Sequence, residues 1–266
     1  MTPLSVESNI KFHYESAGKG EPLLFLHGFG GSSLWWKYQQ QYFEGGFHVV
    51  SVDLPGHGQS SWMEGNLLDI AKRVRVLCNA LGLYKVNIVA SSFGGLVALE
   101  LYRLMSDNIA RMSFVGSIPK FARSDAYPAG LDIKKIRTMS AQFDRDYAFI
   151  LDVFFRSLFT MKERDSEQFK AVKELRSNEK LPDQRALKAF LNILEKEDLR
   201  DRLSTIGCPV QFITGAEDYI CPIDVMEWIQ DHMPNARLDF IDGCGHLPFL
   251  TKPKEYNDLL ENFLIN

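Results

Sequence analysis

The sequence predicts an α/β protein in which a mostly parallel central sheet, flanked by helices, is interrupted by an all-helical insertion. Three observations lead to this prediction. Short apolar runs alternate with amphipathic helical segments in both the first and the last parts of the chain. Residues 118–202, which lie between those parts, show helical periodicity without a convincing strand. This insertion of about 85 residues is also too long and too periodic to be a loop.

Length and composition are those of an ordinary globular protein. The chain has 266 residues, of which 45% are hydrophobic and 24% are charged, so one large domain or a core with an insertion is expected. The net charge of −4 argues against a protein that binds nucleic acid or anionic membranes over its whole surface. No apolar run approaches the roughly 20 residues of a membrane span, and no signal peptide is evident. We therefore expect a cytoplasmic monomer with reduced thiols.

The predicted strands are short runs dominated by apolar residues. Three of the first four are nearly continuous in such residues, as expected for strands buried on both faces of a sheet. Helical segments separate the strands, which indicates βαβ units and a parallel sheet. The predicted strands span residues 22–26, 47–54, 86–91, 111–116, 209–214 and 237–241. The predicted core helices span residues 66–81, 93–105, 223–232 and 254–264.

The insertion differs from the rest of the chain in both periodicity and charge. Its predicted helices span residues 133–143, 147–159, 166–175 and 184–195. We divide the chain into a core, residues 1–117 and 203–266, and a helical lid, residues 118–202. The lid holds 18 Lys and Arg against 15 Asp and Glu, a net charge of +3, whereas the core holds 12 against 19, a net charge of −7. Either a basic face on the lid or scattered surface charge would give this balance.

Ser92 is the candidate nucleophile. It lies in the predicted turn between a strand and a helix, which is the context of a nucleophile elbow. Such a sharp turn requires small residues two positions before and two positions after the nucleophile, and Ser92 has Ala90 and Gly94 there. Ser91 would instead be flanked by bulky Val89 and Phe93, so it is rejected. The alternative is a serine-rich turn that caps the following helix.

A glycine-rich loop, residues 27–31, follows the strand at 22–26 and predicts an oxyanion hole. Its glycines allow the backbone to fold toward the elbow with N–H groups directed into the site. The amides of Phe29 and Phe93 are the expected donors, and losing one such donor typically costs about 10²–10³ in rate. A phosphate-binding loop is the main rival, but the chain contains neither G-K-[ST] nor G-x-G-x-x-G there.

Asp218 and His246 complete a candidate catalytic triad. Each follows a predicted strand, where parallel sheets place their sites, and the chain order is Ser92, Asp218, His246. His246 would accept and return the serine proton while Asp218 fixes the useful tautomer. Glu217 is the rival acid. The structural alternatives are that Asp218 is a loop carboxylate that caps a helix and that His246 is a residue of a tight turn.

The remaining polar motifs predict no further chemistry. Asp53 and Ser60, in the turn around His57, are interpreted as structural hydrogen-bonding residues. We expect His13, His48 and His232 on the surface. The chain has no H-x-x-x-H or H-E-x-x-H pattern, so we expect no metal and no cofactor. No C-x-x-C pair occurs among Cys78, Cys208, Cys221 and Cys244.

The chain resembles the α/β-hydrolase fold superfamily in five motifs. They are HGFGG, DLPGHGQS, SSFGG, the GAED acid turn and the GH turn. The resemblance implies this fold, with the helical lid inserted after the sixth strand, and a hydrolase with an acyl-enzyme intermediate. Haloalkane dehalogenases of this fold use an aspartate nucleophile, so Ser92 argues against them. The fold itself does not fix the substrate.

Residues 117–128, 155–161 and 191–200 of the lid and 245–250 near His246 resemble the biotin-pathway pimeloyl-carrier-protein methyl ester carboxylesterase family. Ala90, in place of the usual elbow glycine, and Ser91, where an aromatic residue or histidine is frequent, depart from the pattern. By this resemblance, the residues expected to contact substrate are Phe29, Ser92, Phe93, Phe155, Arg156, Ser157, Leu158, Phe159 and His246. The lid aromatics Phe143, Phe154, Phe155 and Phe159 would equally suit a plain helical core.

The resemblance implies hydrolysis of the methyl ester of a pimeloyl chain on an acyl carrier protein. The acidic carrier protein is the expected partner, and the basic lid would attract it. Arg123, Arg156 and Lys162 are the candidate lid cations. A general short-chain carboxylesterase or thioesterase is the alternative, followed by a carbon–carbon bond hydrolase and a ligand receptor with very slow turnover. The small-molecule esters in these alternatives need no carrier protein.

Overall fold

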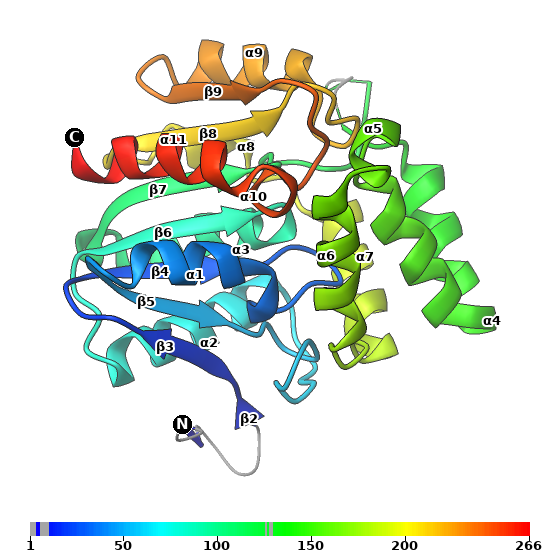
Figure 1. Cartoon of the computed structure of the whole chain (residues 1–266), viewed down its shortest axis with the longest axis horizontal. Helices are drawn as coiled ribbons and strands as arrows, with labels where there is room; N and C mark the ends of the chain where they lie inside the picture. The colour runs from blue at the N-terminus through cyan, green and yellow to red at the C-terminus, as the bar shows by residue number, and fades with distance from the viewer. Residues whose placement is uncertain (1–3, 6–10, 126, 128–129) are drawn as a thin grey trace.

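A seven-stranded sheet forms the centre of the protein (Figure 1). The computed structural model describes residues 4–5, 11–125, 127 and 130–266. The strand order is β3-β5-β4-β6-β7-β8-β9, and β3 is antiparallel to β5 whereas the other neighbours are parallel. This confirms the predicted mostly parallel sheet. The strands are β3 Tyr14–Ala17, β4 Glu21–Leu26, β5 Phe47–Val52, β6 Val86–Ser91, β7 Ile109–Val115, β8 Val210–Gly215 and β9 Arg237–Ile241.

The six strands predicted from apolar runs lie within two residues of their predicted bounds. Every residue of the two strands β6 and β8 is buried, which is expected because helices cover both faces of a parallel sheet. Strand β3 was not predicted, because its sequence YESA at the sheet edge is polar and only partly buried. Two further short strands, β1 Leu4–Ser5 and β2 Lys11–Phe12, pair only with each other in a separate sheet.

Helices cover the two faces of the sheet, with α1 and α11 on one face and α2 and α3 on the other (Figure 1). Between these helices and the sheet, the Trp36 ring stacks on Phe249 at 4.2 Å and meets Phe25 of β4 at 4.8 Å. The core helices are α1 Lys37–Phe43, α2 Leu67–Ala80, α3 Phe93–Met105, α9 Ile223–His232, α10 Pro248–Thr251 and α11 Pro253–Ile265. Two 3₁₀ helices, η1 Ser33–Trp36 and η2 Ser106–Asn108, complete the core. The segments around η1 and α1 were not predicted as helical.

Helices make up most of the lid from Ile133 onward, but its first part differs from the prediction, because Ala122 and Leu131, and Ser124 and Tyr127, form isolated β-bridges before the first helix. Its helices are α4 Ile133–Ser157, α5 Met161–Arg164, α6 Glu167–Ser177, α7 Gln184–Lys196 and α8 Arg200–Leu203. Helix α4 replaces the two helices predicted at 133–143 and 147–159, but it is interrupted at Asp146, where φ is −154° and ψ is 81°. Asp146 Oδ1 accepts a hydrogen bond from Phe149 N at 3.0 Å, so a new helical turn starts there.

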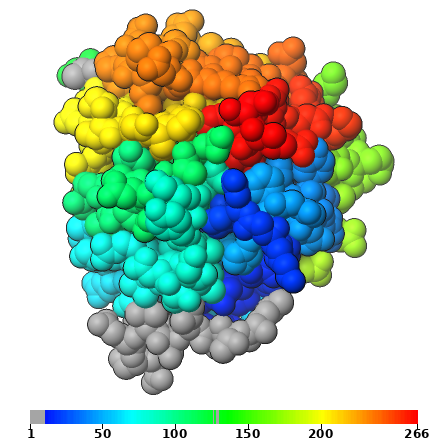
Figure 2. Space-filling model, turned by 90° about the vertical axis from the view of Figure 1, so that its left-hand side faces the viewer, coloured from blue at the N-terminus to red at the C-terminus, as the bar shows by residue number. Residues whose placement is uncertain are grey.

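The lid lies beyond the carboxyl ends of the parallel strands (Figure 1). It follows β7, which is the fifth strand of the main sheet along the chain and not the sixth as expected. The opposite face, seen in Figure 2, is formed mainly by core segments. In the described ranges, no helix is both long enough and apolar enough to cross a membrane. Because parallel sheets place their sites at the carboxyl ends of their strands, we expect the site at the edge of the sheet under the lid.

Candidate active site

Ser92 lies in a strained turn between β6 and α3. Its φ of 50° and ψ of −118° fall in a region that non-glycine residues rarely adopt. The turn is held by a hydrogen bond from Ser92 N to Val115 O at 3.0 Å and one from Ser117 Oγ to Ser92 O at 2.8 Å. A side chain at position 94 would place its Cβ 2.6 Å from Leu26 O, so Gly94 is required. Ser92 makes no capping hydrogen bond to α3, which argues against the alternative of a helix cap.

The loop at residues 27–31 lies against this turn. A Cβ at Gly28 would be 3.0 Å from the Cβ of Ser92, so the absence of a side chain lets the loop approach. Gly30 has a φ of 74°, and Gly31 N donates to Gly28 O at 3.2 Å, which closes a tight turn. Within the described ranges, the amides of Phe29 and Phe93 donate no hydrogen bond to another residue. Both remain available to bind an oxyanion.

Asp218 and His246 form a buried pair. Asp218 Oδ2 lies 2.7 Å from His246 Nδ1, and the other carboxylate oxygen accepts hydrogen bonds from the amides of Ile220 at 2.8 Å and Cys221 at 3.0 Å. Because an ionised carboxylate only accepts, Nδ1 carries the proton and Nε2 is left as the basic nitrogen. Glu217, the rival acid, is exposed to solvent.

Two glycines bring the histidine to the end of the sheet beside the elbow. Gly116 follows β7 with a φ of 52°, and a Cβ there would lie 2.9 Å from both Cε1 and Nδ1 of His246. Gly215 ends β8, and its Cβ would lie 2.0 Å from Gly245 O. Since Val115, next to Gly116, accepts the hydrogen bond from Ser92 N, the turns that carry Ser92 and His246 both adjoin the end of β7.

Aromatic side chains of the lid cover the two residues with free amides. Phe29 stacks with Phe143 of α4 at 6.3 Å and meets Phe154 edge-on at 5.3 Å. Phe93 stacks with Phe190 of α7 at 4.0 Å. The surroundings of the predicted oxyanion hole are therefore apolar, which strengthens any hydrogen bond made there.

The lid segment predicted to contact substrate divides into different environments. Phe155 and Phe159 pack with each other and with Phe169 of α6, and Phe155 also meets Trp35 of the core at 5.7 Å. Leu158 is buried, and its carbonyl accepts a hydrogen bond from His246 N at 2.8 Å. Ser157 Oγ accepts one from Tyr219 OH at 2.8 Å, next to Asp218 in the chain. The structure brings this segment to the backbone of the histidine turn.

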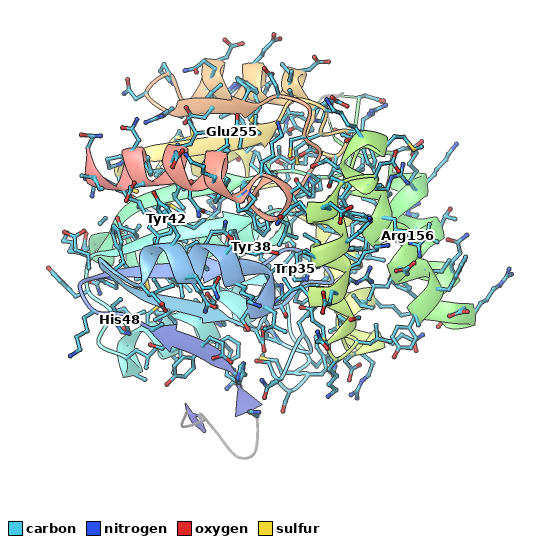
Figure 3. All side chains as sticks on the ribbon, in the orientation of Figure 1. Trp35, Tyr38, Tyr42, His48, Arg156 and Glu255 are labelled. Carbon is cyan, nitrogen blue, oxygen red and sulfur yellow. The ribbon has the colours of Figure 1, made fainter. Side chains whose placement is uncertain are left out.

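Arg156 lies outside this group. Its side chain is 59% exposed and forms an ion pair with Asp152 at 2.9 Å. Figure 3 shows Trp35 beside α6 and Arg156 farther out on the lid. The structure thus places Arg156 on the surface of the lid, and its contact with substrate stays a prediction. Arg123 and Lys162 are also exposed.

The structure corrects one prediction about the other histidines. His13 was expected on the surface but is buried, because its Nδ1 bonds Asp53 Oδ2 at 2.9 Å. Burial alone would raise the pKa of Asp53, but hydrogen bonds from His13 and from the amides of Gln59 and Ser33 lower it to about 2. Ser60 Oγ donates to Asp53 O at 2.6 Å. Asp53 and Ser60 therefore have the structural role that the sequence predicted.

A metal is a poor fit to the cluster of possible ligands around His246. Asp218, Cys221 and His246 place one ligand atom each within 4.8 Å of one another. Burial raises the pKa of the Cys221 thiol well above its usual value, and nearby Asp218 raises it further. A neutral thiol is a weak ligand, and Nδ1 of the histidine already donates to the carboxylate.

Three lid contacts were missed from the sequence: one to the elbow, one to the histidine turn and one to the segment that follows the glycine-rich loop. They come from the lid residues Phe190, Glu163 and Glu179. Thr160 and Glu163 form a capping box, so the pattern T-x-x-E would have predicted the start of α5. No sequence signal distinguishes the other two from ordinary surface or core positions of a helical segment.

Glu179 joins the lid to the segment that follows the glycine-rich loop. It accepts hydrogen bonds from Ser32 Oγ and, at 3.0 Å, from Trp35 Nε1. Burial raises the pKa of Glu179 to about 7, although these two hydrogen bonds and nearby Arg176 favour the charged form. The folded protein therefore retains this proton over a range in which the unfolded chain has lost it.

We expect Glu179→Gln to remove a pH-dependent loss of stability. Between the usual value of 4.5 and about 7, the folded state binds the proton more tightly, so wild-type stability falls as pH rises and the full loss is present above about 7. The free energy of unfolding of the wild type should fall by about 2 kcal/mol relative to Glu179→Gln between pH 4.5 and pH 8. Urea unfolding at both pH values measures this, with exposed Glu174→Gln as the control. A constant difference would contradict it.

Comparison with known proteins shows which family the chain belongs to. The family described as alpha/beta hydrolase fold matches residues 21–253. The chain belongs to the alpha/beta hydrolase family. This confirms the fold class and superfamily predicted from the sequence motifs.

Curated relatives agree with the narrower resemblance. The pimeloyl-[acyl-carrier protein] methyl ester esterase of Nitrosomonas europaea is 31% identical over 245 residues, which cover 92% of this chain and 96% of the relative. The protein of the same name from Aromatoleum aromaticum is 30% identical over 253 residues, covering 90% and 96%. Among solved structures, a bromoperoxidase from Bacillus anthracis superposes with a TM-score of 0.89 at 26% identity, covering 98% of this chain and 97% of that one. The predicted resemblance to this esterase family is confirmed.

Proposed function

We propose that the protein is a serine carboxylesterase that works through a covalent acyl-enzyme. The observation that carries this proposal is the buried pair of Asp218 and His246, at 2.7 Å, beside the strained turn of Ser92. This pairing fixes the imidazole with Nε2 unprotonated, which is the form a general base requires.

The chemistry then follows in two steps. His246 Nε2 removes the Ser92 proton as Oγ attacks the ester carbonyl, and the amides of Phe29 and Phe93 stabilise the oxyanion. The histidine returns the proton to the departing alkoxide, so methanol leaves and the acyl group stays on the serine. Water, activated by the same nitrogen, attacks the acyl-enzyme and releases the acid. Asp218 stabilises the imidazolium in both steps.

We further propose that the natural substrate is the methyl ester of a pimeloyl chain carried by an acyl carrier protein. The names of relatives that align with at least 90% of this chain support it. The charge of the lid also supports it, since +3 over residues 118–202 would attract an acidic carrier domain that the core at −7 would repel. The packed rings of Phe29, Phe143 and Phe154 make the surroundings of the proposed oxyanion hole apolar, which suits the methylenes of the chain.

We expect the carrier-linked methyl ester to have a kcat/KM at least about tenfold above that of a free monomethyl ester at low salt. The advantage should shrink as salt rises, because screening acts over about 8 Å at physiological ionic strength. Assays at two salt concentrations measure this. Growth without biotin of a strain that lacks its own esterase, restored by the wild type and not by Ser92→Ala, is the test in cells.

Two results would contradict the pimeloyl-carrier substrate, and each would favour a different function. Equal kcat/KM for the free and carrier-linked esters at low salt would favour a general short-chain carboxylesterase. A single burst with retained product would favour a ligand receptor with slow turnover. A panel of acetate, butyrate, octanoate and dicarboxylate monomethyl esters separates the first of these from the proposed enzyme.

A further inference from the structure

A buried glutamate of the lid contacts the turn that carries the proposed base. Glu163 lies in α5 and is 5% exposed. Its Oε2 accepts hydrogen bonds from the amides of Thr160 at 2.8 Å and Gly245 at 2.9 Å. Its Oε1 accepts from Thr251 Oγ1 at 2.5 Å and from Cys244 Sγ at 3.0 Å. Three of these four donors therefore lie on the segment that includes the histidine.

The lid and this turn are in close contact around the glutamate. His246 N donates to Leu158 O at 2.8 Å, which is a second hydrogen bond from the turn to the lid. A Cβ at Gly245 would lie 2.6 Å from Leu158 O and 3.1 Å from Glu163 Oε2, so there is no space for a side chain. The histidine is consequently held at its ring by Asp218 of the core and at its backbone by the lid.

The chemistry of the glutamate matches this position. All four groups that face its oxygens are donors, and an ionised carboxylate is the side chain that only accepts. In the described part of the chain, no Lys or Arg forms an ion pair with it. Buried carboxylates are costly unless they are satisfied by hydrogen bonds, so these four bonds determine where the segment from 244 to 251 can lie.

We propose that Glu163 is a positioning residue for His246. It fixes the backbone of residues 244–246 so that Nε2 of the imidazole is directed to Ser92. This inference rests on the proposed serine esterase mechanism and assigns part of it to the lid. Because the histidine acts in both steps, and the glutamate contacts the turn and not the nucleophile, the effect falls on kcat and leaves KM nearly unchanged.

The test compares Glu163→Ala and Glu163→Gln on a small free methyl ester, which needs no carrier protein. We expect Glu163→Ala to lower kcat by about 10–100-fold, because misplacing a catalytic group by about 1 Å can cost about 10². KM should stay within about threefold. Glu163→Gln should recover part of the rate, since its amide oxygen can accept from Gly245 N and its NH₂ can donate to Thr251 Oγ1.

Glu167→Gln is the matched control, because Glu167 lies on the neighbouring lid helix, is 86% exposed and forms an ion pair with Lys170. It should leave kcat unchanged. Thr251→Val removes one donor and should lower kcat by about 3–10-fold, so it decides the question if Glu163→Ala does not fold. Rates are expressed per folded protein, measured by thermal unfolding and circular dichroism.

The inference is overturned if folded Glu163→Ala retains the wild-type kcat. It is also overturned if KM changes and kcat does not, or if glutamine is no better than alanine at position 163. Failure of the proposed mechanism has a different signature, since Ser92→Ala would then retain activity. Loss of activity in Ser92→Ala with full activity in Glu163→Ala would reject only the positioning role.

Discussion

Replacing Ser92 with alanine is expected to lower kcat for ester hydrolysis by about 10⁴–10⁶-fold. The change removes the attacking oxygen, so only the oxyanion donors and substrate binding would remain. The fold should survive, because the turn is held by the backbone bonds of Ser92 to Val115 and Ser117 and not by the serine hydroxyl. A steady-state assay with a p-nitrophenyl ester, together with thermal unfolding, measures both effects.

Ser91→Ala is the matched control for this prediction. Ser91 is adjacent and buried, and its hydroxyl has no hydrogen-bond partner in the described part of the chain. Its loss should change kcat by less than about tenfold. Labelling with a fluorophosphonate, followed by peptide mapping, should modify Ser92 in the wild type and in Ser91→Ala. Modification at another residue, or undiminished hydrolysis by Ser92→Ala, would reject Ser92 as the nucleophile.

The sequence predicted the sheet and the turns at its carboxyl edge because both depend on local patterns. Strands such as β6 are continuous apolar runs, and the residues that follow them in a parallel sheet meet at one edge. The requirement for small residues around position 92 selected Ser92, and the structure places this serine in the strained turn. Glu217 remained the rival of Asp218 in the sequence, and the structure distinguishes them because Asp218 is buried and Glu217 is exposed.

The sequence was less informative where a residue depends on a partner far along the chain. His13 was expected on the surface because nothing near it in sequence indicates the carboxylate of Asp53, 40 positions away. Glu163 and Glu179 lie in charged helical segments, where most carboxylates are solvated, and their partners are on the core.

Helical periodicity in the lid also fails to identify packing partners that are distant in the sequence. It predicts which side chains are buried, but not whether they pack on other lid helices or on the core. Phe155 and Phe159 were placed at the substrate by resemblance, and this stays a prediction. Both pack on Phe169 of the lid, and Phe155 also contacts Trp35 of the core. Phe143, Phe154 and Phe190 are the lid aromatics that contact the loop and the elbow.

Asp218→Asn is expected to lower kcat by about 10⁴-fold while the protein stays folded. The reason lies in the two backbone amides, of Ile220 and Cys221, that donate to Oδ1 of the aspartate. In the variant these donors would bind the amide oxygen, so the NH₂ group would face His246. The imidazole would then have to accept at Nδ1, and its proton would move to Nε2. A protonated Nε2 cannot remove a proton from Ser92.

The matched control is Glu217→Gln, at the neighbouring exposed carboxylate, which should retain kcat within about twofold. A pH profile separates the tautomer effect from simple misfolding. In Asp218→Asn, activity should recover partly at high pH, where hydroxide can replace the general base, whereas an unfolded variant would not recover. Near wild-type kcat at neutral pH for Asp218→Asn would show that the carboxylate does not orient His246. An equal loss in Glu217→Gln would transfer the acid role to Glu217, although its exposed carboxylate lacks the two amide donors that hold Asp218 in place.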